Sequence, residues 1–192
     1  MELTEILQKR RMTRSFESRA LDPTTVKRVL AAALRAPSAG HTQGVELLVL
    51  EGPKETHRYW DAALPADARP SFAWPRLLAA PLLVVVLSSE DAYRHRYDEG
   101  DKGGAVFDVP WWHVDAAFTA LLLQLAAIDV GLGASFFRAH GVDALRRTFA
   151  IPSTFTPVGT VAIGHPAPDR PSSSVANRSR RPAADVVHRG RW

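Results

Sequence analysis

Three arginines lie within five positions near the N-terminus: Arg10, Arg11 and Arg14, in the stretch RRMTRSF. A guanidinium group is planar and can donate two parallel hydrogen bonds to a phosphate. On a continuing helix Arg10 and Arg14 would share a face and repel each other by roughly a few tenths of a kcal/mol, which a bound anion would reverse. The cluster is therefore either an anion site or the solvated basic end of a helix.

A second group of arginines lies near the C-terminus, in NRSRRP (177–182). Arg178 and Arg180 alternate, so in an extended segment both side chains point to the same side. A disordered basic tail and a nucleic-acid-binding segment are the alternatives. The tail lacks the interleaved aromatic residues of single-strand binders, and Asp169 and Asp185 dilute its charge, so we expect no nucleic acid as a partner.

The stretch APSAGHTQG (36–44) consists of small and polar residues at the end of a predicted helix. Exposed backbone amides, together with Ser38, His41, Thr42 and Gln43, could form hydrogen bonds to a planar ring. An ordinary surface loop would have the same composition, so both interpretations stay open.

Several other kinds of chemistry find no support in the sequence. The chain has no cysteine, which excludes disulfides, thiolate metal sites and thiol redox chemistry. Its seven histidines form no HxxxH pattern and no pairing with carboxylates, so we expect no metal site. There is no GxSxG elbow and no Walker loop, and GLGASF follows a helix and lacks the third glycine of a dinucleotide-binding turn.

Composition indicates one globular domain over residues 1–192, with 166–192 as an extended tail. Hydrophobic residues make up 46% of the chain and charged residues 23%, and the net charge is +4. Only four of the 24 basic residues are lysines, a bias that a GC-rich genome would also produce. No uninterrupted apolar run approaches the ~18 residues of a membrane span, and the N-terminus does not look like a signal peptide. We expect a cytoplasmic protein without a membrane partner.

Periodicity predicts alternating helices and strands. Helices are expected over 2–10, from the Asp22 N-cap and Pro23 to Pro37, over 71–81, over 114–130 with Gly131 and Gly133 as cap and turn, and over 141–152. Strands are expected over 45–52, 82–89, 134–137 and 157–166, and residues 91–108 are expected to form a mobile surface segment. LLVVVLSS is apolar enough to be buried on both faces of a sheet.

This order of elements favours an α+β fold with one central sheet. The helix over 114–130 is apolar on nearly every side. A chain of this size can hardly bury such a helix alone, so we expect a homodimer packed around it.

Together these segments resemble the flavin-dependent nitroreductase family over nearly the whole chain. RRMTRSF resembles its R-R-x-x-R-x-F motif, APSAGHTQG its A-P-S-x-x-N-x-Q-P-W loop, and RSRRP its final K-x-R-x-P. APLLVVVL, DAAFTALLLQLAAIDVGLGASF and IPSTFTPVGTVAIGHP resemble a central strand, the long dimer-core helix with its G-L-G exit, and a late strand that ends in G-x-P. Each motif is weak alone, whereas six in the family's order are specific.

The resemblance implies an α+β homodimer with a mostly antiparallel central sheet flanked by helices, with FMN bound at the subunit interface. The residues that it assigns to the phosphate, ribityl chain and ring within one subunit are Arg10, Arg11, Met12, Arg14, Arg178 and Arg180. Those that would reach the ring from the partner subunit are Pro37, Ser38, Ala39, Gly40, His41 and Gln43. Those along the other side of the ring are Phe136, Phe137 and Arg138, with the Arg138 backbone N–H near the flavin N5 atom, and Arg76 at the pyrimidine end.

The implied activity is two-electron ping-pong transfer from NADPH or NADH to nitroaromatic, quinone or similar planar acceptors. A cysteine-free chain fits this because the redox chemistry would belong to the cofactor. Two departures concern the interface loop, where His41 replaces the usual Asn and Gly44-Val45 replace Pro-Trp. A deazaflavin-binding relative and a flavin-storage protein without turnover remain alternatives.

Overall fold

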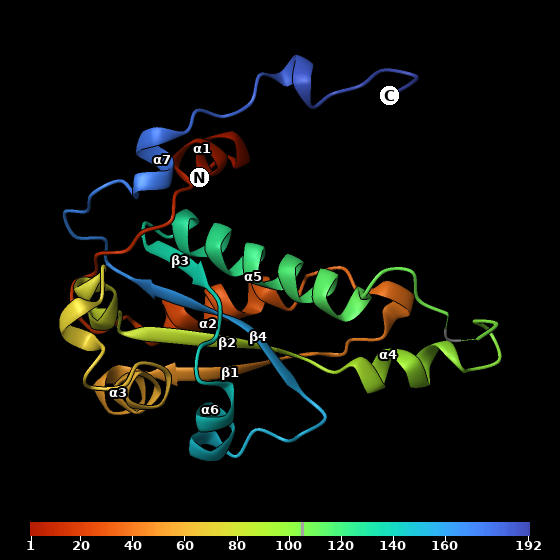
Figure 1. Cartoon of the computed structure of the whole chain (residues 1–192), viewed down its shortest axis with the longest axis horizontal. Coiled ribbons are helices and arrows are strands. Elements are labelled where there is room, and N and C mark those ends of the chain that lie inside the picture. The colour runs from red at the N-terminus through yellow and green to blue at the C-terminus, as the bar shows by residue number, and fades with distance from the viewer. Residues whose placement is uncertain (105) are drawn as a thin grey trace.

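The core of the protein is a four-stranded sheet in the order β1-β2-β4-β3, seen in the computed structural model of Figure 1. The strands are β1 (Val45–Glu51), β2 (Leu82–Ser88), β3 (Gly133–Phe137) and β4 (Thr156–Gly164), and all three pairings are antiparallel. The structure describes residues 1–104 and 106–192, excepting the side chain of Val175. The predicted α+β class with an antiparallel sheet is confirmed.

Helices cover both faces of the sheet. On one face, Val84 and Val86 of β2 pack with α2 (Pro23–Ala33) and α5 (Trp111–Asp129). On the other, Leu83 and Val85 pack with α3 (Gly52–Ala63) and α6 (Val142–Phe149). All seven residues of β2 are buried, which confirms that this apolar strand is enclosed on both sides.

Both N-terminal helices form where the sequence predicts them. At the start of α2 the Asp22 carboxylate accepts a hydrogen bond of 2.8 Å from the backbone N–H of Thr25, so the predicted N-cap is confirmed. The first helix, α1 (Leu3–Lys9), ends before Arg10. Arg10 and Arg14 therefore do not share a helical face, and the helical repulsion considered for them does not arise.

Two helices that lie before α5 were not predicted. α3 begins with Gly52 and Pro53 directly after β1. α4 (Glu90–Tyr97) lies where a mobile segment was expected, because its charged residues did not suggest a helix. The Ser89 hydroxyl caps this helix by accepting a hydrogen bond from the backbone N–H of Ala92. Of the expected segment 91–108, Ala105 lies outside the described residues. The predicted helix over 71–81 is replaced by two short 3-10 turns, η2 (Arg69–Ser71) and η3 (Pro75–Ala79).

The long helix α5 is only partly covered by its own chain. Eight of its 19 residues are buried, whereas Phe118 and Leu121 are each 42% exposed. By length and composition alone α5 could cross a membrane, with a mean hydropathy of 1.3, so the expectation that no segment reaches that length needs correction. Its contacts with α2 and all four strands are those of a core helix. Of the two glycines after it, Gly131 forms the turn, whereas Gly133 already belongs to β3.

The chain after β4 runs over the α1 side of the molecule. It contains α7 (Ser173–Asn177) and η4 (Ala183–Asp185) and ends away from the sheet (Figure 1). Packing of this tail on a partner subunit stays a prediction.

Candidate functional site

The N-terminal arginines are held between two segments that are distant in sequence. Thr13 N–H donates to the Ala134 carbonyl of β3 at 2.9 Å, and Ala167 N–H donates to the Ser15 carbonyl at 3.0 Å. Gly133 permits this approach, because a Cβ there would lie 2.8 Å from the Thr13 side chain. The segment after Arg10 is therefore a short extended piece between β3 and the start of the C-terminal tail.

Asp169 fastens the tail to this extended segment. One of its carboxylate oxygens accepts from the backbone N–H of Arg14 at 2.7 Å, and the other accepts from that of Arg170 at 2.9 Å. Both bonds go to backbone groups. The carboxylate thus fixes the chain, and among the described residues it forms no ion pair with a guanidinium group.

These contacts create a cavity of about 410 Å³ with arginines on its walls, which we call the arginine cavity. Its lining residues come from both ends of the chain: Arg10, Arg11, Met12, Arg14, Asp169, Arg170, Pro171, Ser172 and Arg180. In the part of the chain that the structure describes, no salt bridge involves Arg10, Arg14 or Arg180. Their guanidinium groups are available to an anion. Arg178 does not line this cavity, although it was predicted beside Arg180.

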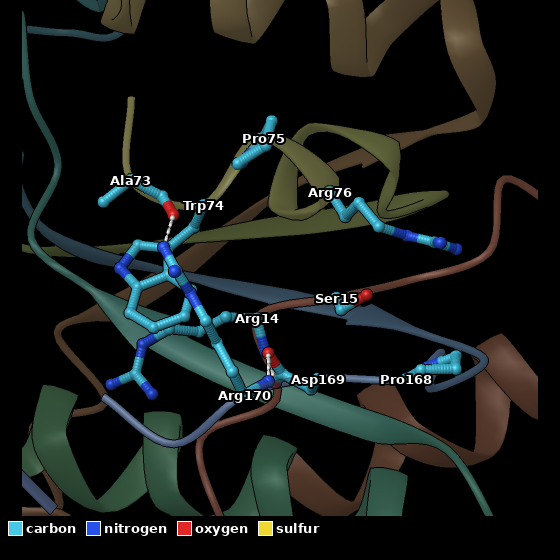
Figure 2. A pocket seen from close by; sticks show the side chains of 9 residues that line it. All are labelled: Arg14, Ser15, Ala73, Trp74, Pro75, Arg76, Pro168, Asp169 and Arg170. Carbon is cyan, nitrogen blue, oxygen red and sulfur yellow. Dashed lines mark hydrogen bonds between the residues drawn. The ribbon is translucent and has the colours of Figure 1, made fainter. Parts of the chain in front are cut away.

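A second cavity, of about 440 Å³, shares Arg14, Asp169 and Arg170 with the first (Figure 2). We call it the tryptophan cavity, because the guanidinium carbons of Arg14 and Arg170 lie 5.0 and 5.4 Å from the ring centre of Trp74. Arg76 lines this cavity as well. Neither Trp74 nor Arg170 was predicted, and nothing in their sequence neighbourhoods distinguishes them.

A third cavity, of about 400 Å³, lies between α3 and β3, and we call it the aromatic cavity. Arg14, Tyr59, Trp60, Ala63, Leu64, Phe72, Trp74, Leu77, Ser135, Phe136, Phe137 and His140 line it. The rings of Trp60 and Phe137 stack at 5.6 Å with an interplanar angle of 16°. Phe136 and Phe137 line this cavity together with Arg14, whereas Arg138 is exposed and lines none of the three cavities. Sequence reasoning missed Trp60 because it missed α3.

The loop that carries Pro37 to Gln43 has a strained but firmly held backbone. Gly40, His41 and Gln43 have φ angles of 62°, 54° and 55°, in the left-handed region that non-glycine residues rarely adopt. The buried Asp115 carboxylate accepts from Ala39 N–H at 2.8 Å and from the Tyr93 hydroxyl at 2.6 Å. Burial, and next this bond to Asp115, raise the pKa of Tyr93.

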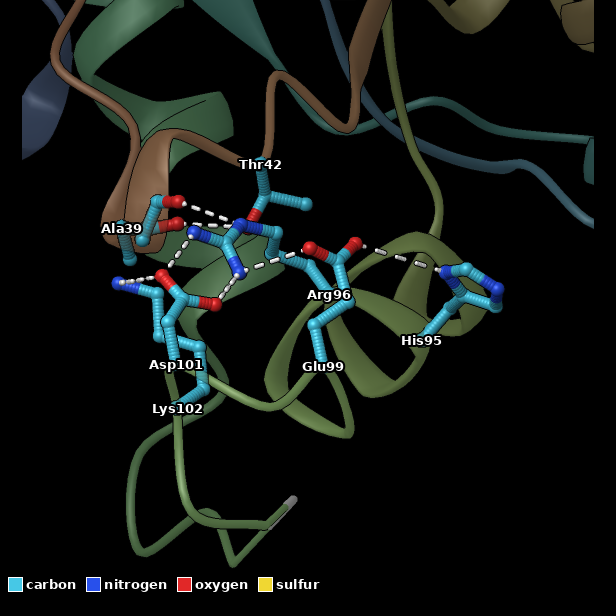
Figure 3. A network of polar contacts seen from close by, with 8 residues as sticks. Ala39, Thr42, His95, Arg96, Glu99, Asp101 and Lys102 are labelled. Atoms are coloured by element: carbon cyan, nitrogen blue, oxygen red, sulfur yellow. Dashed lines mark hydrogen bonds and ion pairs between the residues drawn. The ribbon is translucent and has the colours of Figure 1, made fainter.

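Arg96 of α4 holds the same loop from the other side (Figure 3). Its Nε donates to the Gly40 carbonyl at 3.0 Å, and its Nη atoms bind Asp101 at 2.7 and 2.9 Å. This hydrogen bonding lowers the pKa of Asp101 to about 2. The ring of Tyr97 also packs so closely that a Cβ on Gly40 would lie 2.9 Å from it. The exposed side chains of Pro37, His41 and Gln43 therefore project from a fixed backbone.

Within one chain, the loop and the arginine cavity are not brought together. Asp115 anchors the loop at the N-terminal end of α5, whereas Thr13 pairs with β3 just beyond the C-terminal end (Figure 1). A helix of 19 residues is ~28 Å long at ~1.5 Å per residue. Pro37, Ser38 and Gln43 instead line a separate cavity of about 260 Å³ beside α5.

Known proteins share this architecture. A crystallised nitroreductase family protein from Clostridium difficile 630 superposes with a TM-score of 0.76 at 19% identity, covering 100% of both chains. An "FMN-dependent Nitroreductase" from C. difficile R20291 superposes with a TM-score of 0.72 at 18% identity, over 99% of this chain and 100% of the other. These likenesses establish the fold.

Sequence relatives cover the same length. A protein of Archaeoglobus fulgidus, described as "Putative NADH dehydrogenase/NAD(P)H nitroreductase", is 22% identical over 100% of this chain and 99% of its own. The family model described as "Nitroreductase family" matches residues 7–165. Since that match spans far more than half of the 192 residues, the chain belongs to the nitroreductase family of oxidoreductases.

Proposed function

We propose that the protein is an FMN-dependent oxidoreductase that uses NADPH or NADH to reduce planar acceptors such as quinones and nitroaromatics. The observation that carries the proposal is the arginine cavity, in which Arg10, Arg14 and Arg180 meet although more than 160 positions separate the first from the last. Three guanidinium groups around one cavity suit a dianionic phosphate.

The residues around the cavities fit the different parts of FMN. Arg10, Arg14 and Arg180 would hold the phosphate, and Arg14 continues into the tryptophan cavity, where Arg76 would meet the ring. When bound, the flavin would supply the two-electron chemistry, since no side chain of this chain can. The contribution of the protein would be to bind and orient the ring, to exclude water and to place positive charge beside it.

A second copy of the chain would complete the site. The loop that carries His41 is rigid and exposed, and it lies about one helix length from the arginines of its own chain. Phe118 and Leu121 on the exposed side of α5 offer an apolar surface for a twofold contact. In such a homodimer, the loop of one subunit would reach the ring bound to the other.

A direct test is the mass spectrum of whatever cofactor is released when the purified protein is denatured. FMN supports the proposal, and a deazaflavin would replace it by the related alternative. The flavin bands should bleach when NADPH or NADH is added under nitrogen and return on addition of a quinone. A yellow protein that neither reductant bleaches would be a storage protein, and a colourless protein that refuses FMN would exclude the proposal.

A further inference from the structure

We propose that His41 is the proton donor when the acceptor is reduced, and that it acts in the subunit opposite to the one whose arginines hold the cofactor phosphate. The inference rests on the proposed function and adds a catalytic residue to that site. For a quinone, the bound cofactor delivers two electrons and one hydrogen from NAD(P)H, and His41 delivers a proton to a carbonyl oxygen. The products are a hydroquinone and a neutral imidazole, which water protonates again.

His41 is suited to this role by its residue type and its exposure. In the stretch from Pro37 to Gly44 it is the only residue whose side chain exchanges a proton near neutral pH. Its side chain is exposed, so a molecule that lies against the loop contacts it directly. The arginines of the arginine cavity cannot replace it, because a guanidinium group does not release its proton in proteins.

The backbone holds His41 in a conformation that glycine adopts more easily. The φ angles of His41 and Gln43 are 54° and 55°. Strained residues of this kind persist only where the surrounding structure fixes them, and they are concentrated at functional sites. Asp115 and Arg96 hold this loop on its two sides. The imidazole therefore projects from a fixed point.

Gln43 orients the imidazole ring. Its amide nitrogen Nε2 lies 2.9 Å from His41 Nε2. Since an amide NH₂ group only donates, this contact pairs with a neutral ring that carries its proton on Nδ1. When the ring is protonated, a half-turn of the amide presents the amide oxygen to the Nε2–H. Gln43 thus serves Nε2 in both states, while Nδ1 gives up its proton.

The titratable groups that contact the loop or its anchors come from α4, the turn after it and α5. They are Tyr93, Arg96, Tyr97, Glu99, Asp101, Lys102 and Asp115. Arg96 is paired with Glu99 and Asp101 (Figure 3). Among the described residues, His41 forms no ion pair with any of these groups, so its imidazole can both gain and lose a proton.

The test separates the proton step from cofactor binding and reduction. His41→Gln keeps a hydrogen-bonding side chain that cannot release a proton, and His95→Gln, at an exposed position of α4, is the matched control. Stopped-flow absorbance gives the rate of flavin bleaching by NADPH and the rate at which menadione restores the flavin bands. Imidazole NMR on the FMN-loaded wild type follows the titration of His41 without turnover.

His41→Gln should slow the return of the flavin bands at pH 7 by about 10²–10⁴-fold. Flavin content and bleaching should not change, added imidazole should restore part of the rate, and His95→Gln should behave as wild type. The wild-type rate should fall as pH rises through the NMR midpoint of His41, whereas the His41→Gln rate should not.

Equal rates of return in wild type and His41→Gln would overturn the inference. A slowing that imidazole does not rescue, or a midpoint that differs between rate and NMR, would overturn it too, because His41 would then act through structure alone. Should His41→Gln not assemble, His41→Asn gives the same readout.

The subunit assignment is tested in a heterodimer in which one chain carries Arg10→Ala and Arg180→Ala, so that only the other chain holds flavin. The slow return should follow His41→Gln on the arginine-deficient chain. A slow return that follows His41→Gln on the flavin-holding chain would overturn the assignment.

Failure of the proposed function has a different signature. A protein that takes up no flavin, or that neither NADPH nor NADH bleaches, refutes that function before the second rate is measured, and the inference falls with it. Failure of the inference alone leaves bleaching and return intact in His41→Gln.

Discussion

The arginine cavity and the loop around His41 were both expected to contact one cofactor, yet they are built in different ways. The arginine cavity forms where the two ends of the chain meet, and Asp169 binds backbone N–H groups there, while Arg10, Arg14 and Arg180 form no salt bridge within the described residues. The loop is a local feature with left-handed residues, fixed by Asp115, Tyr93 and Arg96. One region offers free charge, and the other offers a rigid backbone.

The difference supports the proposal that a second copy of the chain completes the site. Unpaired arginines need a ligand to offset their mutual repulsion. Backbone strain in the loop lowers the stability of the fold. Such strain is typically found where exposed side chains contact a ligand or another subunit. Since α5 separates the two regions by ~28 Å, a cofactor bound between two copies, as proposed, would meet both needs at once.

The largest effect is expected in the arginine cavity. Arg10→Ala combined with Arg180→Ala removes two charge-assisted hydrogen-bond partners of the phosphate, each worth about 1.5–3 kcal/mol. FMN affinity, measured by titration of the flavin-free protein, should fall by about 10²–10⁴-fold. The melting temperature without flavin should stay the same, because these side chains form no ion pair in the described chain. A double variant that retained its flavin would identify these arginines as a solvated face.

Mixing two defective chains tests the division of the site between subunits. One chain carries Arg10→Ala and Arg180→Ala, and the other carries Gly40→Val, which strains the loop at its positive φ and drives a Cβ into Tyr97. A heterodimer of these chains has one doubly defective site and one intact site. We therefore expect one flavin per heterodimer, although each homodimer is defective, as measured by absorbance on a doubly tagged preparation. No recovery would mean that each chain builds its own site.

The sequence predicted the arginines of the cavity and the residues of the loop better than the residues that hold them in place. RRMTRSF and NRSRRP were separate clusters until the resemblance joined them, and the structure brings Arg180 beside Arg10 while leaving Arg178 outside. Trp60 and Arg96 were missed because they lie on α3 and α4. α4 is hard to predict from the sequence because many of its residues are charged. α3 is hard to predict because it begins with Gly-Pro directly after a strand. Asp115 could not be recognised as the anchor of the loop, since its partners come from two other segments.

Removing that anchor should weaken the loop end of the molecule. Asp115→Leu removes the acceptor of the buried Tyr93 hydroxyl and of the part-buried Ala39 N–H, at about 1–3 kcal/mol each. The free energy of unfolding in urea should fall by about 2–4 kcal/mol. Asp115→Asn, which keeps one acceptor oxygen, should lose less, and Asp101→Asn at the exposed partner of Arg96 should change little. Equal losses in Asp115→Leu and Asp101→Asn would contradict the role of the buried carboxylate.

The smallest expected effect is a fall in the free energy of unfolding at alkaline pH, caused by Tyr93 at the loop end of the molecule. The pKa of Tyr93 is raised in the folded state from an ordinary value of 10.0. Below pH 10 both states hold the proton and the stabilisation is complete. Above pH 10 the unfolded state loses the proton first, so the free energy of unfolding falls by up to about 1.4 kcal/mol per pH unit. Tyr93→Phe should be less stable at pH 8 yet show a shallower fall between pH 10 and 11.

Tyr59 provides a control for this last measurement. It lies in the core on the other face of the sheet, where burial raises its pKa to about 12. Tyr59→Phe should flatten the same part of the curve without touching the loop. No tyrosine lines the arginine cavity, so flavin affinity in the Arg10→Ala/Arg180→Ala protein should not follow this profile. If Tyr93→Phe left the slope of urea stability against pH unchanged while Tyr59→Phe reduced it, the Tyr93–Asp115 bond would not persist in solution, and the loop would be held by Arg96 and by the bond from Ala39 N–H to Asp115.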